Sequence, residues 1–215
     1  MPNQDAFAAK RGPQGLVATV SDGLGSRSKS DLGARKACEA AVRVVSDWAR
    51  GGGFDPHRLP LLIESEWRSQ LGDLDPGDCA ATCLFVHWPT SGRVTTGSIG
   101  DGLVVLQTED GTLHTHAPRE ADAFANMTAS LGPGPGAWEI RQTAAECCIR
   151  RVLLATDGVS DDLDPGALAR FLEWLQSEAS SLLPWRRRRR LAAHLQNWPT
   201  PSHSDDKTVV LLWTR

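Results

Sequence analysis

The segment Val152-Leu153-Leu154-Ala155-Thr156-Asp157-Gly158 is a short apolar run that ends on a carboxylate followed by a glycine. A bounded run of aliphatic residues is typical of a buried strand. We therefore expect a strand that ends at the rim of a sheet and places Asp157 there.

Three other segments also join an expected strand to an acidic residue. They are Leu16-Val17-Ala18-Thr19-Val20-Ser21-Asp22-Gly23, Val94-Thr95-Thr96-Gly97-Ser98-Ile99-Gly100-Asp101-Gly102 and, with the acids before the strand, Ser204-Asp205-Asp206-Lys207-Thr208-Val209-Val210-Leu211-Leu212-Trp213. Together the four segments predict one carboxylate cluster. Carboxylates that converge repel one another, so either some hold protons at raised pKa or a multivalent cation neutralises them. Oxygen ligands favour hard ions, so Mg²⁺ or Mn²⁺ fits such a cluster better than Zn²⁺ or copper.

Each junction also has a simpler interpretation. An Asp-Gly pair is a common turn signal, and a single pair after a strand is typical of a hairpin. Hairpin geometry alone would explain Gly100-Asp101-Gly102, and Asp5 would be an ordinary solvated acid near a terminus. The order and the flanking residues of the acidic segments therefore decide between a cluster and separate turns.

Five motifs occur in an order that resembles the metal-dependent protein phosphatase 2C family, in a compact bacterial form. They are Asn3-Gln4-Asp5, Ser21-Asp22-Gly23-Leu24-Gly25, Ser98-Ile99-Gly100-Asp101-Gly102, Ala155-Thr156-Asp157-Gly158 and Asp205-Asp206-Lys207-Thr208. The resemblance covers nearly the whole chain and implies an α+β fold, a four-layer α-β-β-α sandwich with two packed antiparallel sheets. We expect residues 1–215 to form a single catalytic domain, a size that suits one core. The segment 118–136 is short where many bacterial members have a larger flap, which predicts an open site.

The resemblance also implies a set of site residues. The implied metal ligands are Asp22, Gly23 through its carbonyl, Asp157, Asp205, Asp5 through water, and Asp101 at a third ion. Two Mn²⁺ or Mg²⁺ ions, with a third left open, would be held there. Asp22 and Asp157 would position a metal-activated water that hydrolyses phosphoserine and phosphothreonine in proteins.

The sequence departs from the family pattern at three positions. The family usually has a phosphate-binding arginine three residues before the Asn of the first motif, and the sequence contains no such position. Arg27 is a candidate substitute, because a guanidinium matches phosphate oxygens, although an exposed loop residue is the simpler interpretation. Asp206 stands where the family usually has Asn, and Leu24 stands where some members have His. Two alternatives stay open. The open site would permit a phosphatase for small molecules or for phosphoarginine or phosphohistidine, and the missing arginine and Asp206 favour a catalytically weak regulatory module that binds a phosphoprotein or a kinase partner.

Composition restricts the class of protein further. The net charge of −3 argues against a nucleic-acid-binding protein, and no apolar run is long enough to span a membrane. The N-terminus does not resemble a signal peptide, so we expect a cytoplasmic protein. The family resemblance implies a phosphoprotein substrate and a cognate Ser/Thr kinase as partners. Five cysteines within largely apolar segments favour reduced thiols over a disulfide framework.

Hydrophobic periodicity predicts helices over residues 33–50, 59–71, 165–179 and about 185–195. It predicts strands over residues 81–88, 92–99, 103–108, 112–117, 138–146 and 208–213. Residues 186–190 are five consecutive arginines within the last helix. A solvated helix face explains them, while a binding site for nucleic acid, anionic lipid or an acidic partner is the alternative.

Overall fold

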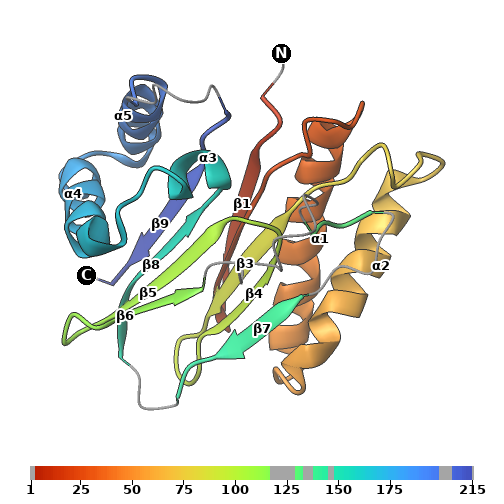
Figure 1. Ribbon diagram of the computed structural model, residues 1–215. Coiled ribbons are helices and arrows are strands. Elements are labelled where there is room, and N and C mark those ends of the chain that lie inside the picture. The colour runs from red at the N-terminus through yellow and green to blue at the C-terminus, as the bar shows by residue number, and fades with distance from the viewer. Residues whose placement is uncertain (1–2, 117–128, 133–137, 145–147, 199–204, 215) are drawn as a thin grey trace.

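Two antiparallel sheets pack face to face in the computed structural model, with helices on both outer sides (Figure 1). The structure describes residues 3–116, 129–132, 138–144, 148–198 and 205–214. The α+β class and the four-layer α-β-β-α sandwich expected from the sequence are confirmed. The apolar segment 152–155 is part of an inner strand of one sheet.

The first sheet has the strand order β1-β2-β3-β4-β7. Its strands are β1 Ala6–Gly12, β2 Gly15–Ser21, β3 Cys83–Trp88, β4 Thr95–Ile99 and β7 Glu139–Gln142. The second sheet has the order β6-β5-β8-β9. Its strands are β5 Leu103–Thr108, β6 Leu113–His116, β8 Ile149–Ala155 and β9 Val209–Trp213. All neighbouring strands run antiparallel.

Helices α1 and α2 cover the first sheet, and α3, α4 and α5 lie on the side of the second (Figure 1). Their bounds are α1 Ser30–Arg50, α2 Leu59–Leu71, α3 Asp157–Ser160, α4 Leu168–Ser180 and α5 Pro184–Gln196, with 3-10 turns η1 Pro56–Arg58 and η2 Pro165–Ala167. Within the described ranges, no helix combines the length and the apolar character needed to cross a bilayer.

The predicted elements differ from the structure mainly at their ends. The helix expected to open at Pro165 begins as the 3-10 turn η2, because the Asp164 carboxylate accepts a 2.9 Å hydrogen bond from the Gly166 N–H and holds the entry tight. The strand expected over residues 138–146 is shorter: β7 ends at Gln142, and residues 145–147 lie outside the described part. The segment 118–136, where the short flap was expected, lies largely outside it as well.

Three apolar layers hold the sandwich together: one lies between the two sheets, and one lies between each sheet and the helices that cover it. Side chains such as Val20, Leu84 and Leu154 fill the space between the sheets. Between the first sheet and its helices lie Phe85 and Trp67, and the Trp67 indole N–H donates a 3.0 Å hydrogen bond to the Gly33 carbonyl. This bond is buried, so it fixes α2 on α1 as well as satisfying both polar groups.

The close approach of α1 to the chain before β3 gives a test of this packing. A Cβ atom at Gly33 would overlap the backbone carbonyl of Cys79, which no rotamer change relieves. Helix propensity alone favours Ala over Gly by about 1 kcal/mol, whereas overpacking costs about 1–3 kcal/mol or more. We expect Gly33→Ala to lower the free energy of unfolding, measured in urea, by about 1–2 kcal/mol.

Gly12→Ala is the matched control, because a Cβ atom at Gly12 meets nothing within 4 Å. Its free energy of unfolding should stay within about 0.5 kcal/mol of the parent value. A stabilised Gly33→Ala protein would contradict the packing of α1 described above.

Candidate active site

Strand register gathers the predicted acids at one end of the sandwich. In the first sheet the first residue of β1, Ala6, pairs with the last residue of β2, Ser21, so Asp5 and Asp22 lie at the same end. In the second sheet the end of β8 pairs with the starts of β5 and β9. Asp101, Asp157 and Asp205 are therefore neighbours in space, although they are far apart in the chain.

The bend at Asp101 brings the two halves of this cluster together. It connects β4 of the first sheet to β5 of the second. The chain turns sharply there, with φ of +106° at Gly100, and a Cβ atom on Gly102 would lie 2.6 Å from the Ala155 carbonyl oxygen. The motif therefore forms a tight bend, and this bend sets Asp101 beside Asp157.

Thr156 connects the cluster across the two sheets. Its hydroxyl donates a 2.8 Å hydrogen bond to Asp5 Oδ2 and accepts one of 3.1 Å from the Thr208 N–H. The Thr156 N–H donates in turn to the Thr208 carbonyl at 3.1 Å. The buried Thr156 therefore fixes the Asp5 carboxyl relative to β9 and the start of α3, a role that the sequence analysis missed.

Asp206 and Gln4 form a second connection of this kind. The Gln4 N–H donates a 2.6 Å hydrogen bond to Asp206 Oδ2, and the Gln4 carbonyl accepts from the Gly23 N–H at 3.2 Å. The Gln4 side chain donates to Ser30 Oγ at 2.7 Å. Asp206, which stands where the family usually has Asn, thus anchors the N-terminal segment.

The backbone of Asp22 is held by Thr82 on both sides. The Asp22 N–H donates to Thr82 Oγ1 at 2.9 Å, and the Thr82 N–H donates to the Asp22 carbonyl at 2.8 Å. Gly23 follows in an isolated antiparallel bridge with Ala81. This geometry aims the Asp22 side chain from a fixed position rather than from a free turn.

Two of the glycines after the acids are required by close backbone contacts. A Cβ atom on Gly158 would overlap the Asp206 carbonyl, and one on Gly23 would lie 2.6 Å from the Ser30 carbonyl oxygen. The Asp157-Gly158 pair does not form a hairpin: Asp157 begins the one-turn helix α3, and its Oδ1 accepts a 2.8 Å hydrogen bond from the Gly158 N–H. Glycine here lets residues 205–206 lie directly against α3.

The electrostatics show that the acids interact. Burial, followed by the neighbouring Asp5, Asp157 and Asp205 carboxyl groups, raises the pKa of Asp22 to about 9. Burial and then the Asp101 carboxylate raise the pKa of Asp157 to about 6, and burial raises the pKa of Asp5. The cluster therefore opposes full ionisation of its own carboxyl groups unless a cation is present.

The unsatisfied oxygen atoms fit a hard cation. Asp5 Oδ1 is buried and accepts no hydrogen bond, and no described residue donates one to the buried Gly23 carbonyl. Buried oxygens of this kind are normally paired, and a carboxylate and carbonyl set suits Mg²⁺ or Mn²⁺. Within the described ranges, no three Asp, Glu, His or Cys side chains are already close enough to hold a metal ion together. The structure thus gathers the acids in one region without closing them into a finished coordination sphere.

Arg27, the candidate phosphate ligand, lies in the exposed turn between Gly23 and α1. Its N–H donates a 2.8 Å hydrogen bond to the Leu24 carbonyl, which shapes the turn. Its guanidinium makes no hydrogen bond or ion pair with the described residues. The structure places Arg27 in the loop that follows Asp22 but does not bring its side chain onto the carboxylates.

Comparisons with known proteins agree with this architecture. The profile of the Protein phosphatase 2C family matches residues 1–198. No curated protein matches the sequence. Among solved structures, RsbX in complex with magnesium superposes with a TM-score of 0.55 at 19% identity, covering 98% of this chain and 87% of RsbX.

Two further structures show the same fold. The photosystem II phosphatase PBCP superposes with a TM-score of 0.65 at 14% identity, covering 100% of this chain and 92% of PBCP. The SiaA-PP2C domain of Pseudomonas aeruginosa gives a TM-score of 0.61 at 16% identity, covering 99% of this chain and 81% of that domain. With a family match over most of its length and this architecture, the chain belongs to the protein phosphatase 2C family.

Proposed function

We propose that residues 1–215 form one catalytic domain, a metal-dependent phosphatase that removes phosphate from phosphoserine and phosphothreonine in proteins. The observation that carries this proposal is the convergence of acids from five distant segments at one end of the sandwich, with Asp5 Oδ1 buried and unpaired. Family membership supports protein phosphatase activity.

The proposed ligands of two Mn²⁺ or Mg²⁺ ions are Asp22, the Gly23 carbonyl, Asp157 and Asp205, with Asp5 acting through water and Asp101 at a third ion. One similar solved structure, that of RsbX, is a complex with magnesium. Such ions lower the pKa of a bound water and neutralise charge on a phosphoryl group.

The chain itself contributes position and charge. Thr156 and Thr82 hold Asp5 and Asp22 in place through hydrogen bonds of 2.8 and 2.9 Å, so little reorganisation is needed when substrate arrives. The raised pKa of Asp22 means that its carboxyl must release a proton before it serves as a charged ligand.

Two buried thiols beside Thr19 are not suited to act as nucleophiles. Cys38 and Cys83 flank the Thr19 hydroxyl at 3.9 and 4.0 Å. Burial raises the pKa of both thiols, that of Cys83 to about 12, so neither is a thiolate at neutral pH. Hydrolysis by an activated water is the reaction that the oxygen-rich cluster supports best.

A regulatory module that binds a phosphoprotein or a kinase is the second candidate function. Two observations favour it: Arg27 is exposed and away from the carboxylates, and Asp206 is occupied by its hydrogen bond to the Gln4 N–H. We prefer the enzyme, because every acid implied as a ligand is present. A phosphoprotein substrate and a cognate Ser/Thr kinase stay predictions, as does the cytoplasmic location.

Loss of a ligand should abolish turnover. We expect Asp157→Asn to lower kcat/KM for para-nitrophenyl phosphate and for a phosphothreonine peptide by about 100-fold or more, because charge stabilisation worth several kcal/mol is removed. The assay compares Mn²⁺, Mg²⁺ and chelator. Asp164→Asn is the control, since its amide can still accept from the Gly166 N–H outside the cluster. Equal activity of the parent and Asp157→Asn, or turnover that persists in chelator, contradicts the metal-dependent mechanism.

The raised pKa of Asp22 predicts an unusual pH dependence in chelator. The folded pKa is raised from 3.8 to about 9, so the unfolded chain releases this proton first. The contribution of this group to stability is complete below pH 3.8 and is lost as the pH rises toward 9. An Asn side chain at this position does not ionise, so the variant loses no stability at this residue as the pH rises. We expect metal-free Asp22→Asn to be more stable than the parent at pH 8 by about 1 kcal/mol or more. Each kcal/mol corresponds to a rise in Tm of about 2–4 °C.

Added Mn²⁺ should reverse this order in thermal unfolding, because an ion that binds only the folded protein stabilises the parent more than the variant. The control measurement is made at pH 5, where the two metal-free proteins should differ less. If Asp22→Asn is the less stable protein in chelator at pH 8, the neighbouring carboxyl groups do not raise the pKa of Asp22 in the way described above.

The expectation that Arg27 binds the substrate phosphate is tested by substrate affinity. We expect Arg27→Ala to raise KM for a phosphothreonine peptide several-fold while kcat changes little, since a solvent-exposed phosphate contact is worth about 1 kcal/mol. Arg93→Ala, at an exposed arginine in the chain before β4, is the control. If KM does not change in Arg27→Ala, Arg27 is an ordinary exposed loop residue and does not bind the substrate phosphate.

A further inference from the structure

Helix α5 carries five consecutive arginines, and three of them contact the rest of the protein. Arg190 Nε donates a 2.8 Å hydrogen bond to Glu178 of α4. Arg187 Nε donates to the Leu182 carbonyl at 2.7 Å, and the Arg187 guanidinium lies 5.5 Å from the centre of the Trp213 ring. Arg188 lies 5.4 Å from the centre of the Phe7 ring on β1.

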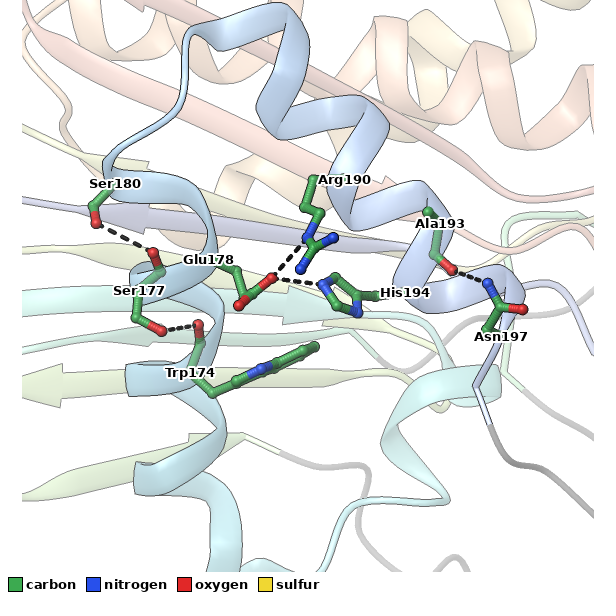
Figure 2. A network of polar contacts seen from close by, with 8 residues as sticks. All are labelled: Trp174, Ser177, Glu178, Ser180, Arg190, Ala193, His194 and Asn197. Atoms are coloured by element: carbon green, nitrogen blue, oxygen red, sulfur yellow. Dashed lines mark hydrogen bonds and ion pairs between the residues drawn. The ribbon is translucent and has the colours of Figure 1, made fainter.

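A polar network fixes α5 on α4, as Figure 2 shows. Glu178 Oε2 accepts hydrogen bonds from Arg190 and from His194 Nε2, the latter at 2.7 Å. The His194 ring also packs edge-on against Trp174, with 4.9 Å between centroids. Because Arg190 and His194 lie about one turn apart on the same face of α5, these contacts set its rotation and therefore which of its arginines face outward.

Arg186 and Arg189 are left on the outward side. Both are exposed, and no carboxylate of the described residues forms an ion pair with either of them. They border an open hollow of about 460 Å³, which we call the basic hollow. It is lined by Leu182, Trp185, Arg186, Arg189, Arg190 and Ala193.

The floor of the basic hollow is apolar. Leu182 and Ala193 contribute aliphatic surface, and Trp185 is 60% exposed with its ring 4.9 Å from the Arg186 guanidinium carbon. Exposed Trp and Arg together are typical of the residues that dominate binding energy at protein interfaces. A hollow that is apolar inside and cationic at its border fits an apolar side chain flanked by carboxylates or phosphates.

We propose that the basic hollow binds an acidic segment of a protein partner, which inserts one apolar side chain against Trp185. Charge complementarity selects the acidic sequence, and the concave apolar floor favours a single side chain over the flat surface of a membrane. The net charge of −3 of the protein as a whole disfavours a nucleic acid at this surface.

Helix α5, which carries the basic hollow, contacts the strand that follows the first acid of the candidate active site. Arg188 of this helix lies over the ring of Phe7 in β1, and Phe7 follows Asp5 by two residues. In Figure 1, α5 and α3 lie at the end of the molecule from which the N-terminus leaves. The segment bound there would belong to a substrate whose phosphorylated residue reaches the carboxylates; this part of the inference depends on the proposed phosphatase function.

Binding is tested without catalysis, in chelator. The probe is a fluorescein-labelled peptide with a leucine between two pairs of glutamates, and fluorescence anisotropy gives its Kd. We expect the double variant Arg186→Glu and Arg189→Glu to weaken binding about ten-fold or more, and Trp185→Ala to do the same. Replacing the peptide leucine by serine, or raising NaCl from about 50 to 300 mM, should also weaken binding.

The matched control is the double variant Arg58→Glu and Arg93→Glu, which makes the same change in net charge at exposed arginines of the other layer. It should bind the peptide with a Kd within about two-fold of the parent value, apart from the small general effect of net charge. Equal loss of binding in the two double variants would overturn the inference, because it would show nonspecific attraction. So would tighter binding to phosphatidylserine vesicles or to single-stranded RNA than to the peptide.

Kinetics separate this inference from the proposed function. With a phosphothreonine peptide that carries the same acidic segment, the Arg186→Glu and Arg189→Glu double variant should raise KM about ten-fold and leave kcat and para-nitrophenyl phosphate hydrolysis unchanged. If para-nitrophenyl phosphate is hydrolysed but KM does not change, the docking inference is wrong and the function stands. If the acidic peptide binds as expected but no substrate is hydrolysed, the function is wrong and the binding surface stands.

Discussion

The hydroxyl of Thr156 is the interaction on which the active-site end of the structure depends. It accepts a hydrogen bond from the Thr208 N–H and donates one to Asp5, so it links β8, β9 and the segment before β1. Neither sheet alone contains all three partners. The carboxylate cluster therefore exists only when the two sheets are packed, and its geometry reports directly on the packing of the core between them.

The packing of the core offsets a large electrostatic cost that arises in the carboxylate cluster. Keeping Asp22 protonated at neutral pH, or charged beside Asp5 and Asp157, costs about a few kcal/mol on the scale of its pKa shift. Full burial of one large aliphatic side chain contributes about 1.5–3 kcal/mol. A small number of core residues such as Leu84 and Leu154 is enough to offset the cluster, so a stable fold can maintain an unfavourable site. A cation would then bind to acids that are already held in place.

The parts of the site that the sequence could predict are those encoded by local pattern. The strand β8 and the acid after it follow from an apolar run that ends on Asp157, and antiparallel register then brings Asp5 beside Asp22. Thr156, Gln4 and Asp206 were missed or misjudged because their hydrogen bonds join residues 151 and 202 positions apart, which no periodicity reveals. A hydroxyl or an amide in a strand end looks the same in sequence whether it is solvated or central to a network.

Residues 186–190 also show what a sequence pattern cannot predict. The periodicity of this segment correctly predicts an exposed helix, but the pattern treats five arginines as equivalent. In the folded chain Arg190 donates a hydrogen bond to Glu178 and Arg187 donates one to the Leu182 carbonyl, while Arg188 lies over the ring of Phe7. The apolar floor beside the remaining two comes partly from Leu182, in the turn before the helix. Which charges are available to a partner is therefore decided by tertiary contacts, and one of those contacts, Arg188 with Phe7, joins α5 to the strand that follows Asp5.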